Sequence, residues 1–183
     1  MLQHEVITAK HADISAIRGL YLSSFSKAEQ APFWFIMYRT KTKGINFYSY
    51  YDDAVFAGFA YFVVVIDLTY LRYIAINPNV RSKGYGSQIM KHIEDCYPEN
   101  RIILCIEKID ERAENNHQRM RRRDFYLKNG YISSGLIVEE KNENFELLVK
   151  GGSCSEEDFN KVIKRFAGPL VFPFIKPKLR IIK

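Results

Sequence analysis

Cysteine is scarce in this chain, and its three copies lack the spacing of a metal site or a disulfide framework. The 183 residues contain Cys96, Cys105 and Cys154 with no Cys-x-x-Cys pair. Cys96 and Cys105 fall on the apolar faces of their segments, which predicts reduced core residues in a cytoplasmic protein. The four histidines show no ligand spacing with the cysteines, and we expect no metal.

Long apolar runs are also missing. No stretch approaches the roughly 20 consecutive apolar residues that a membrane span requires. The first residues, Met1–Glu5, lack the basic and then apolar layout of a signal peptide, so we expect no membrane partner. With 47% hydrophobic and 14% aromatic residues, the chain is long enough for one well-packed domain.

Acidic residues are outnumbered by basic ones, 21 to 27, which gives a net charge of +6. Such a surplus suits a polyanionic cofactor or nucleic acid. The basic run Arg119–Arg123 is typical of a solvated helix face, with Met120, Phe125 and Leu127 packing inward. Nucleic-acid surfaces interleave basic residues with stacking aromatics, whereas here the aromatics gather in strand-like segments such as Phe47–Tyr51. The sequence therefore disfavours nucleic-acid binding.

The most informative segment is a basic turn that contains glycines, Arg81–Gly86. It follows an apolar strand, Tyr70–Ile76, and opens a helix whose apolar stripe is Ile89, Ile93, Cys96 and Tyr97. The start of a helix directs unpaired N–H groups and the positive end of its dipole at one spot. Glycines let a ligand approach the backbone, and Arg81 and Lys83 add charge, which favours a phosphate or pyrophosphate. The alternative is an ordinary turn whose charges are solvated.

Two familiar nucleotide motifs do not fit this turn. The dinucleotide fingerprint needs a third glycine where the chain has Ile89. The P-loop ends in Gly-Lys-Ser/Thr, whereas here Ser82 and Lys83 precede Gly84. What remains is a basic residue followed by two glycines with the spacing Arg-x-x-Gly-x-Gly.

A second segment lies downstream, after the strand-like run Ile102–Ile106. It is a helical stretch, Arg121–Tyr131, followed by the strand-like Ile132–Glu139. Gly130 is typical of a helix C-terminus, and Lys128 suits the negative end of the helix dipole.

These two segments, in this order, resemble the GNAT family of N-acetyltransferases over roughly residues 45–150. Arg81-x-x-Gly84-x-Gly86 resembles the family's acetyl-CoA motif, and Phe125-Tyr126-x-Lys128-x-Gly130-Tyr131 resembles the end of its catalytic-domain helix. The resemblance implies acetyl-CoA as donor, with the pyrophosphate on the turn and the pantetheine on the backbone of the preceding strand. The implied cofactor-binding residues are Ile74, Ile76, Arg81, Ser82, Lys83, Gly84, Tyr85 and Gly86.

The resemblance also implies direct attack of a primary amine on the thioester, without a covalent enzyme intermediate. Tyr126 matches the family's general acid; the alternative is an aromatic residue packed on the sheet. Family members often have a glutamate on the strand before the turn, but Tyr70 and Arg72 stand there. Glu107 is the next candidate base, directly or through a water; it could also bind the acceptor's ammonium group or be a surface residue. Arg72 is a candidate to pair with Glu107 or with an acidic acceptor.

The order of segments predicts a mixed, largely antiparallel central sheet with flanking helices, the architecture of the acyl-CoA N-acyltransferases. We expect a strand at His4–Ala9, a helix capped by the Asp13 side chain, a second helix over Lys27–Tyr38 that Pro32 starts or interrupts, and a hairpin at Asp52-Asp53.

Gly151-Gly152-Ser153 separates an acetyltransferase core, residues 1–150, from a C-terminal helix and tail, 151–183, packed on the same domain. Ser155 is the expected cap of that helix, and its apolar face is Phe159, Val162, Ile163 and Phe166. The tail from Pro169 could be a covering strand, a lid or a dimer arm; packing on the chain's own core is the simplest reading.

The sequence thus predicts an acetyl-CoA-dependent N-acetyltransferase acting on a small amine or on a peptide or protein amine. The alternative is a non-catalytic module on the same fold that binds acyl-CoA or nucleic acid, since the strand carboxylate is missing and the net charge is +6.

Overall fold

The computed structural model describes residues 2–141 and 143–182. They form two compact units: unit 1 runs to Val64 and resumes over Leu71–Glu99, and unit 2 comprises Val65–Tyr70 and the chain from Asn100 onward. The expected break at Gly151 lies inside unit 2, and the division into core and tail stays a prediction. The elements in chain order are β1 (Gln3–Val6), α1 (Ile14–Ser24), α2 (Phe33–Arg39), β2 (Ile45–Asp52), β3 (Val55–Val65), β4 (Leu68–Ile76), the 3-10 helix η1 (Pro78–Val80), α3 (Tyr85–Cys96), β5 (Arg101–Glu107), α4 (Asn116–Lys128), β6 (Ile132–Glu140), β7 (Glu143–Lys150), α5 (Glu156–Ala167), α6 (Phe172–Ile175) and β8 (Lys178–Ile181).

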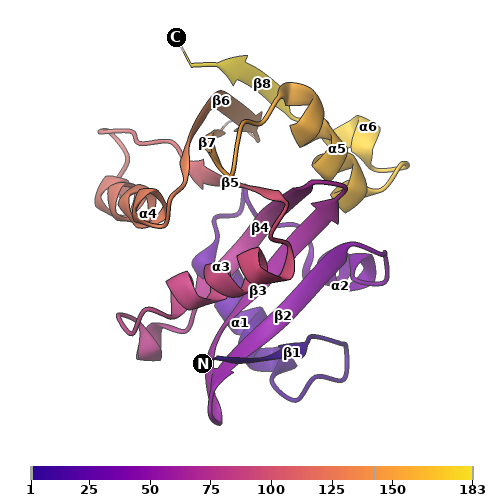
Figure 1. The fold of residues 1–183 in the computed structure, drawn as a ribbon, viewed down its shortest axis with the longest axis vertical. Helices are drawn as coiled ribbons and strands as arrows, with labels where there is room; N and C mark the ends of the chain where they lie inside the picture. Colours follow the sequence, from indigo (N-terminus) through magenta and orange to yellow (C-terminus); the bar gives the residue numbers. More distant parts are fainter. Residues whose placement is uncertain (1, 142, 183) are drawn as a thin grey trace. The chain divides into compact units, whose positions relative to one another are not determined.

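The strands hydrogen-bond in the order β1-β2-β3-β4-β5-β7-β6-β8 (Figure 1). Strands β4 and β5 are parallel and are paired over Leu68–Tyr70 and Arg101–Ile103, within unit 2. The pairs β1–β2, β2–β3, β5–β7, β6–β7 and β6–β8 are antiparallel. The predicted mixed, largely antiparallel sheet with flanking helices is confirmed.

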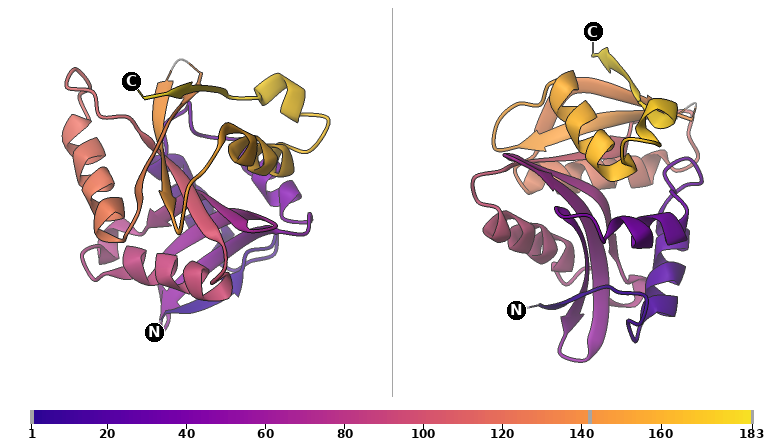
Figure 2. Two further views of the ribbon diagram at one scale, coloured as in Figure 1. Left: turned by 45° about the horizontal axis from the view of Figure 1, so that its top comes forward. Right: turned by 90° about the vertical axis from the view of Figure 1, so that its right-hand side faces the viewer.

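In unit 1 the aromatic strands are buried on both faces. Tyr21 of α1 packs on Phe59 and Tyr73, with ring centroids 6.4 and 5.0 Å away. Phe62, three positions after Phe59 and therefore on the opposite face, packs on Tyr97 at the end of α3, at 6.0 Å. Figure 2 shows α1 and α2 on one side of these strands and α3 on the other.

Some local predictions for unit 1 are confirmed and others are wrong. The hairpin lies at Asp52-Asp53, between β2 and β3. The helix expected over Lys27–Tyr38 begins only at Phe33, directly after its N-cap Pro32, so the first half of that prediction is wrong. The Asp13 side chain does not cap α1, because its Oδ2 accepts a 2.7 Å hydrogen bond from the Tyr51 hydroxyl. Cys96, the last residue of α3, is exposed rather than in the core.

In unit 2 the expected helix is α5, and its predicted apolar face is buried, with the ring of Phe159 packed on Tyr70 at 5.5 Å. Ser155 caps it: the Ser155 Oγ accepts from the Asp158 N–H at 3.1 Å, and the Asp158 carboxylate accepts from the Ser155 N–H at 3.3 Å. Helices α4 and α5 lie on opposite sides of the strands of unit 2 (Figure 2).

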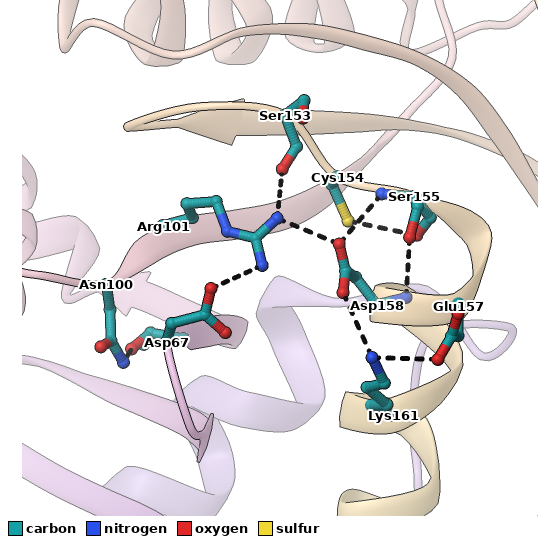
Figure 3. A network of polar contacts seen from close by, with 10 residues as sticks. Asp67, Asn100, Arg101, Ser153, Cys154, Ser155, Glu157, Asp158 and Lys161 are labelled. Carbon is teal, nitrogen blue, oxygen red and sulfur yellow. Dashed lines mark hydrogen bonds and ion pairs between the residues drawn. The ribbon is translucent and has the colours of Figure 1, made fainter.

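Arg101, the first residue of β5, joins three segments of unit 2 (Figure 3). Its guanidinium donates to the Ser153 carbonyl at 2.7 Å, to the Asp158 Oδ2 at 3.0 Å and to the Asp67 Oδ2 at 2.9 Å. The start of α5 is thereby attached to the start of β5 and to the turn before β4. Burial raises the pKa of the Asp158 carboxyl, but the hydrogen bonds from Arg101 and Ser155 outweigh it, so that this pKa is lowered overall.

The C-terminal tail adds an edge strand instead of joining the core. Strand β8 pairs with β6, which agrees with the covering-strand alternative. Leu170 and Phe174 are 85% and 88% exposed, so the expectation that the tail packs into the chain's own core is wrong for them. None of the helices in residues 2–141 and 143–182 combines the length and hydropathy that crossing a membrane needs.

We predict that Asp158→Asn destabilises the chain by about 1 kcal/mol at neutral pH and that the difference from wild type disappears in acid. A carboxyl whose pKa is lower in the folded chain stabilises it above the unfolded pKa, and this contribution is lost as pH falls through the folded pKa. The gap should be full above about pH 5 and should shrink progressively as the pH falls further below about pH 4. Urea unfolding between pH 3 and 7 measures it.

The matched control is Glu157→Gln, because Glu157 is an exposed acid in the same turn and, within the described residues, forms an ion pair with Lys161 alone. This variant should unfold like wild type at every pH. A gap for Asp158→Asn that stayed constant down to pH 3 would contradict the role given to its charge.

Candidate functional site

The residues singled out in the sequence fall into two groups. Ile74, Ile76 and the turn Arg81–Gly86 belong to unit 1, whereas Glu107 and Tyr126 belong to unit 2. The geometry of each group is therefore described within its own unit.

The end of β4 is fixed by a close approach of β3. A Cβ atom at Gly58 would lie 2.2 Å from the Ala75 carbonyl oxygen, so only glycine fits there. The Asn77 side chain donates to the Phe56 carbonyl at 2.8 Å and accepts from the Asn79 N–H at 3.1 Å. The chain therefore leaves β4 in one defined direction, directly after the half-buried Ile74 and Ile76.

The turn itself has two residues in the left-handed region, Ser82 with φ +66° and Gly84 with φ +78°. Gly84 is the N-cap of α3, and no atom lies within 4 Å of the position that a Cβ there would take. Among the described residues, the backbone N–H groups of residues 82–87 donate no hydrogen bond. The turn therefore presents unpaired donors beside open space, which is how a helix N-terminus binds an anion.

The charges at this helix start lack a partner in the described part of unit 1. Arg81 and Lys83 are exposed and form no ion pair with a described residue, and the first turn of α3 has no acidic residue. Cations at the positive end of a helix dipole are unfavourable by themselves, so a bound anion would complete the site. The Tyr85 hydroxyl donates to Asp52 at 2.5 Å, which attaches α3 to the β2–β3 hairpin; this hydrogen bond raises the pKa of Tyr85.

In unit 2 the inward side of α4 is basic, contrary to the prediction. Met120 and Leu127 are 45% and 36% exposed, whereas the arginines at 119, 122 and 123 are partly buried and Tyr126 is buried. The arginines are turned inward because two carboxylates from the neighbouring strands meet them. The solvated basic face expected from the sequence is therefore wrong for three of its four arginines.

Glu107, at the end of β5, is one of these carboxylates, with a side chain only 6% exposed. Its Oε1 accepts from the Asn115 side chain at 3.1 Å and lies 3.3 Å from the Arg119 Nη2. Its Oε2 accepts from the Arg122 Nη1 at 2.9 Å. Glu107 is thus not the surface residue that the sequence left open. A carboxylate has about four acceptor positions, so one position remains beside these three donors.

Glu146, within β7, is the second carboxylate. The Arg123 Nε donates to its Oε2 at 2.9 Å and the Arg123 Nη2 to its Oε1 at 3.3 Å, which makes a bidentate ion pair. This hydrogen bonding raises the pKa of the Arg123 guanidinium.

Tyr126 lies one turn after Arg123 on the same side of α4. Its ring packs on Phe125 and Tyr131, with centroids 5.2 and 5.8 Å away. Gly130, with φ +85°, ends the helix as predicted, and the Tyr131 N–H donates to the Tyr126 carbonyl at 3.1 Å.

The two β4 residues at the expected base position make other contacts. Tyr70 is buried against Phe159. Arg72 donates to the Glu29 carbonyl at 3.2 Å and lies over the ring of Tyr73. Neither residue supplies a carboxylate.

Sequence reasoning missed Asp52, Arg123 and Glu146. The available signals were a lone acid in the apolar segment Phe145–Val149 and arginines at helical spacing with Tyr126. All three cysteines are free, and burial raises the pKa of the Cys154 thiol to about 11, which makes it a poor nucleophile. Within the described ranges no three His, Cys, Asp or Glu side chains are grouped to hold a metal.

Comparison with protein families matches residues 43–133 to the model of the acetyltransferase (GNAT) domain. This range contains the turn, β5 and all of α4. No curated protein sequence matches the chain.

Solved structures match nearly the whole chain at low identity. A protein from Bacteroides thetaiotaomicron assigned to the GNAT family has a TM-score of 0.69 at 20% identity, covering 92% of this chain and 98% of that one. The ribosomal-protein-S18-alanine N-acetyltransferase from Escherichia coli has 0.60 at 15%, covering 85% and 96%. A GNAT family acetyltransferase from Elizabethkingia anophelis with acetyl-CoA bound has 0.57 at 14%, covering 81% and 97%. These likenesses establish the fold.

Proposed function

Through residues 43–133 this chain belongs to the GNAT acetyltransferase family, and from this we propose that it transfers an acetyl group from acetyl-CoA to a primary amine. The acceptor is a small amine or the amine of a peptide or protein. The observation that carries the proposal is the turn before α3, with its unpaired N–H groups and its two cations without a described counter-ion. A cytoplasmic location, expected from the cysteines, belongs to the same proposal.

The turn suits the pyrophosphate of CoA. Backbone N–H groups and the positive end of α3 favour a dianion, and the φ of Gly84 leaves room for its oxygens to approach the backbone. Arg81, Ser82 and Lys83 belong to the same turn, which leads into Tyr85 and Gly86 at the start of α3. The hydrogen bond from the Tyr85 hydroxyl to Asp52 holds the start of the helix in place. Ile74 and Ile76 are proposed to offer backbone hydrogen bonds to the pantetheine arm. Acetyl-CoA, when bound, supplies the acetyl thioester that the amine attacks.

Tyr126 is proposed as the general acid that protonates the departing thiolate. A phenol is neutral at pH 7 and donates a hydrogen bond well, which the task requires. The rings of Phe125 and Tyr131 restrict the orientation of its side chain.

Glu107 is proposed as the base that takes the proton of the attacking amine through a water molecule. Three of its acceptor positions face Asn115, Arg119 and Arg122, so the water would occupy the fourth. Binding the acceptor's ammonium group instead is the alternative that the test below separates.

The rival function is a non-catalytic module that binds acyl-CoA or nucleic acid, supported by the missing strand carboxylate and the basic surplus. Arg119, Arg122 and Arg123 are bound to buried carboxylates, so they are not available to phosphates of a nucleic acid. This observation weighs against the nucleic-acid form of the rival.

We predict that the chain binds acetyl-CoA and free CoA with micromolar affinity and ATP much more weakly, and that Gly84→Val weakens CoA binding about 10-fold or more. The added side chain would fill the space through which the pyrophosphate reaches the backbone. Calorimetric titration with the three ligands measures it.

The control is Gly135→Val, because Gly135 has the same strained φ, +79°, and equal open space, but lies on β6. It should share the backbone strain and leave CoA affinity unchanged. If Gly84→Val binds CoA as tightly as wild type does, the turn is not part of the CoA site. If the wild-type chain does not bind CoA, the non-catalytic binding module becomes the favoured function.

Tyr126→Phe should lower kcat about 100-fold or more, because general acids contribute about 10²–10⁴-fold, while acetyl-CoA affinity stays nearly unchanged. Thiol release in the presence of an amine acceptor gives kcat, and calorimetry gives the affinity. Tyr131→Phe, which deletes the hydroxyl of the neighbouring buried ring, should keep kcat within about two-fold. Equal turnover of Tyr126→Phe and wild type would exclude Tyr126 as the acid.

Glu107→Gln should lower kcat about 100-fold near neutral pH, because a side-chain amide cannot take the proton of the attacking amine. Glutamine keeps an oxygen for one of the arginines, so α4 retains part of its attachment. Glu111→Gln, an exposed acid on the loop before α4, is the control. A rise in the acceptor KM with kcat unchanged would assign Glu107 to ammonium binding instead.

A further inference from the structure

Helix α4 is attached to its neighbouring strands by charge as well as by the packing of the Tyr126 ring. Met120 and Leu127 are largely exposed, whereas its inward side carries arginines and then Tyr126. A hydrogen-bonded ion pair with two contacts has one favourable geometry. The position of Tyr126 therefore depends on which ion pairs form.

The Arg123–Glu146 pair lies on the same side of α4 as Tyr126. Residues three apart on a helix are neighbours on its surface, so Arg123 lies beside Tyr126 along α4. Its guanidinium binds Glu146 through two nitrogens, at 2.9 and 3.3 Å, which fixes direction as well as distance. The Glu146 side chain is only 9% exposed, so water competes weakly for the pair.

Glu146 is itself held on both sides. It stands within β7 opposite Ile106 of β5 and opposite Ile137 of β6. A carboxylate on a strand with two hydrogen-bonded neighbours is a rigid anchor, in contrast to one on a loop. Glu107 provides the other anchor, at the N-terminal half of α4, through Arg119 and Arg122.

We propose that Arg123 and Glu146 are positioning residues: their bidentate ion pair sets the rotation of α4 about its axis and thereby orients the phenol of Tyr126. This inference rests on the proposed function, in which Tyr126 donates a proton. Neither residue needs to touch the substrate. A misplacement of about 1 Å at a reacting group can cost about 100-fold in rate, so a small rotation of α4 is enough.

The test is a double-mutant cycle on kcat. Arg123→Lys keeps the positive charge but cannot form the bidentate contact, and Glu146→Gln removes the negative charge. Each variant should lower kcat about 10- to 100-fold and leave the acetyl-CoA KM within about two-fold of the wild-type value. Because both act through Tyr126, neither should lower kcat further in the Tyr126→Phe background. Glu157→Gln, which breaks an exposed ion pair on α5, is the control and should keep wild-type kcat.

Breaking a buried pair can unfold a protein, so a second variant removes both partners. Arg123→Met with Glu146→Met leaves no unpaired charge, and replacing both members of a buried pair is tolerated better than removing one. This folded variant should show the same loss of kcat and the same absence of further loss in the Tyr126→Phe background.

The inference is overturned if the losses multiply in the double variants, or if Glu146→Gln and Arg123→Lys keep wild-type kcat while Tyr126→Phe does not. If Tyr126→Phe alone keeps kcat, the proposed function of Tyr126 fails instead. Amide hydrogen exchange tests the attachment without turnover: residues 124–131 should exchange faster in Glu146→Gln than in wild type. Equal exchange would also overturn it.

Discussion

Three arginines on the inward side of α4 are tolerated there because two buried carboxylates meet them. A carboxylate out of water without a partner costs several kcal/mol, so the buried Glu107 and Glu146 depend on the partly exposed arginines 119, 122 and 123. Those carboxylates stand on the hydrogen-bonded strands β5 and β7, which fixes the distance between them. The register of these two strands therefore decides where α4 lies, and the place of Tyr126 follows from it.

The basic residues of this chain serve two different purposes, and net charge does not separate them. The inward arginines of α4 are matched by carboxylates and hold the fold together. Arg81 and Lys83 are matched by no described acid, and they stand where a helix dipole already disfavours cations. A surplus of +6 is compatible with many anionic partners. The turn before α3 favours a bound anion because two exposed cations stand beside the N–H groups at the start of a helix.

Features governed by a few neighbouring residues could be predicted from the sequence. The hairpin at Asp52-Asp53, the cap at Ser155 and the helix end at Gly130 depend on contacts within about four positions. The inward side of α4 could not, because helical periodicity assigns apolar residues to the core, and the carboxylates that reverse this rule come from strands before and after the helix. In the candidate site the turn residues were predictable by type, but the attachment of Tyr85 to Asp52 was not.

The missing carboxylate on β4 has a chemical consequence under the proposed function. Tyr70 is buried against Phe159, and arginine at position 72 carries a permanent positive charge, so neither takes a proton from an amine at neutral pH. Deprotonation then falls to Glu107, whose carboxylate already serves two arginines, or to solvent. Only a neutral amine attacks a thioester. An α-amine, with a pKa of about 8, is partly neutral at physiological pH. A lysine side chain, with a pKa of about 10.4, is almost entirely charged. The less the enzyme assists deprotonation of the acceptor, the more the reaction favours an α-amine over a lysine side chain.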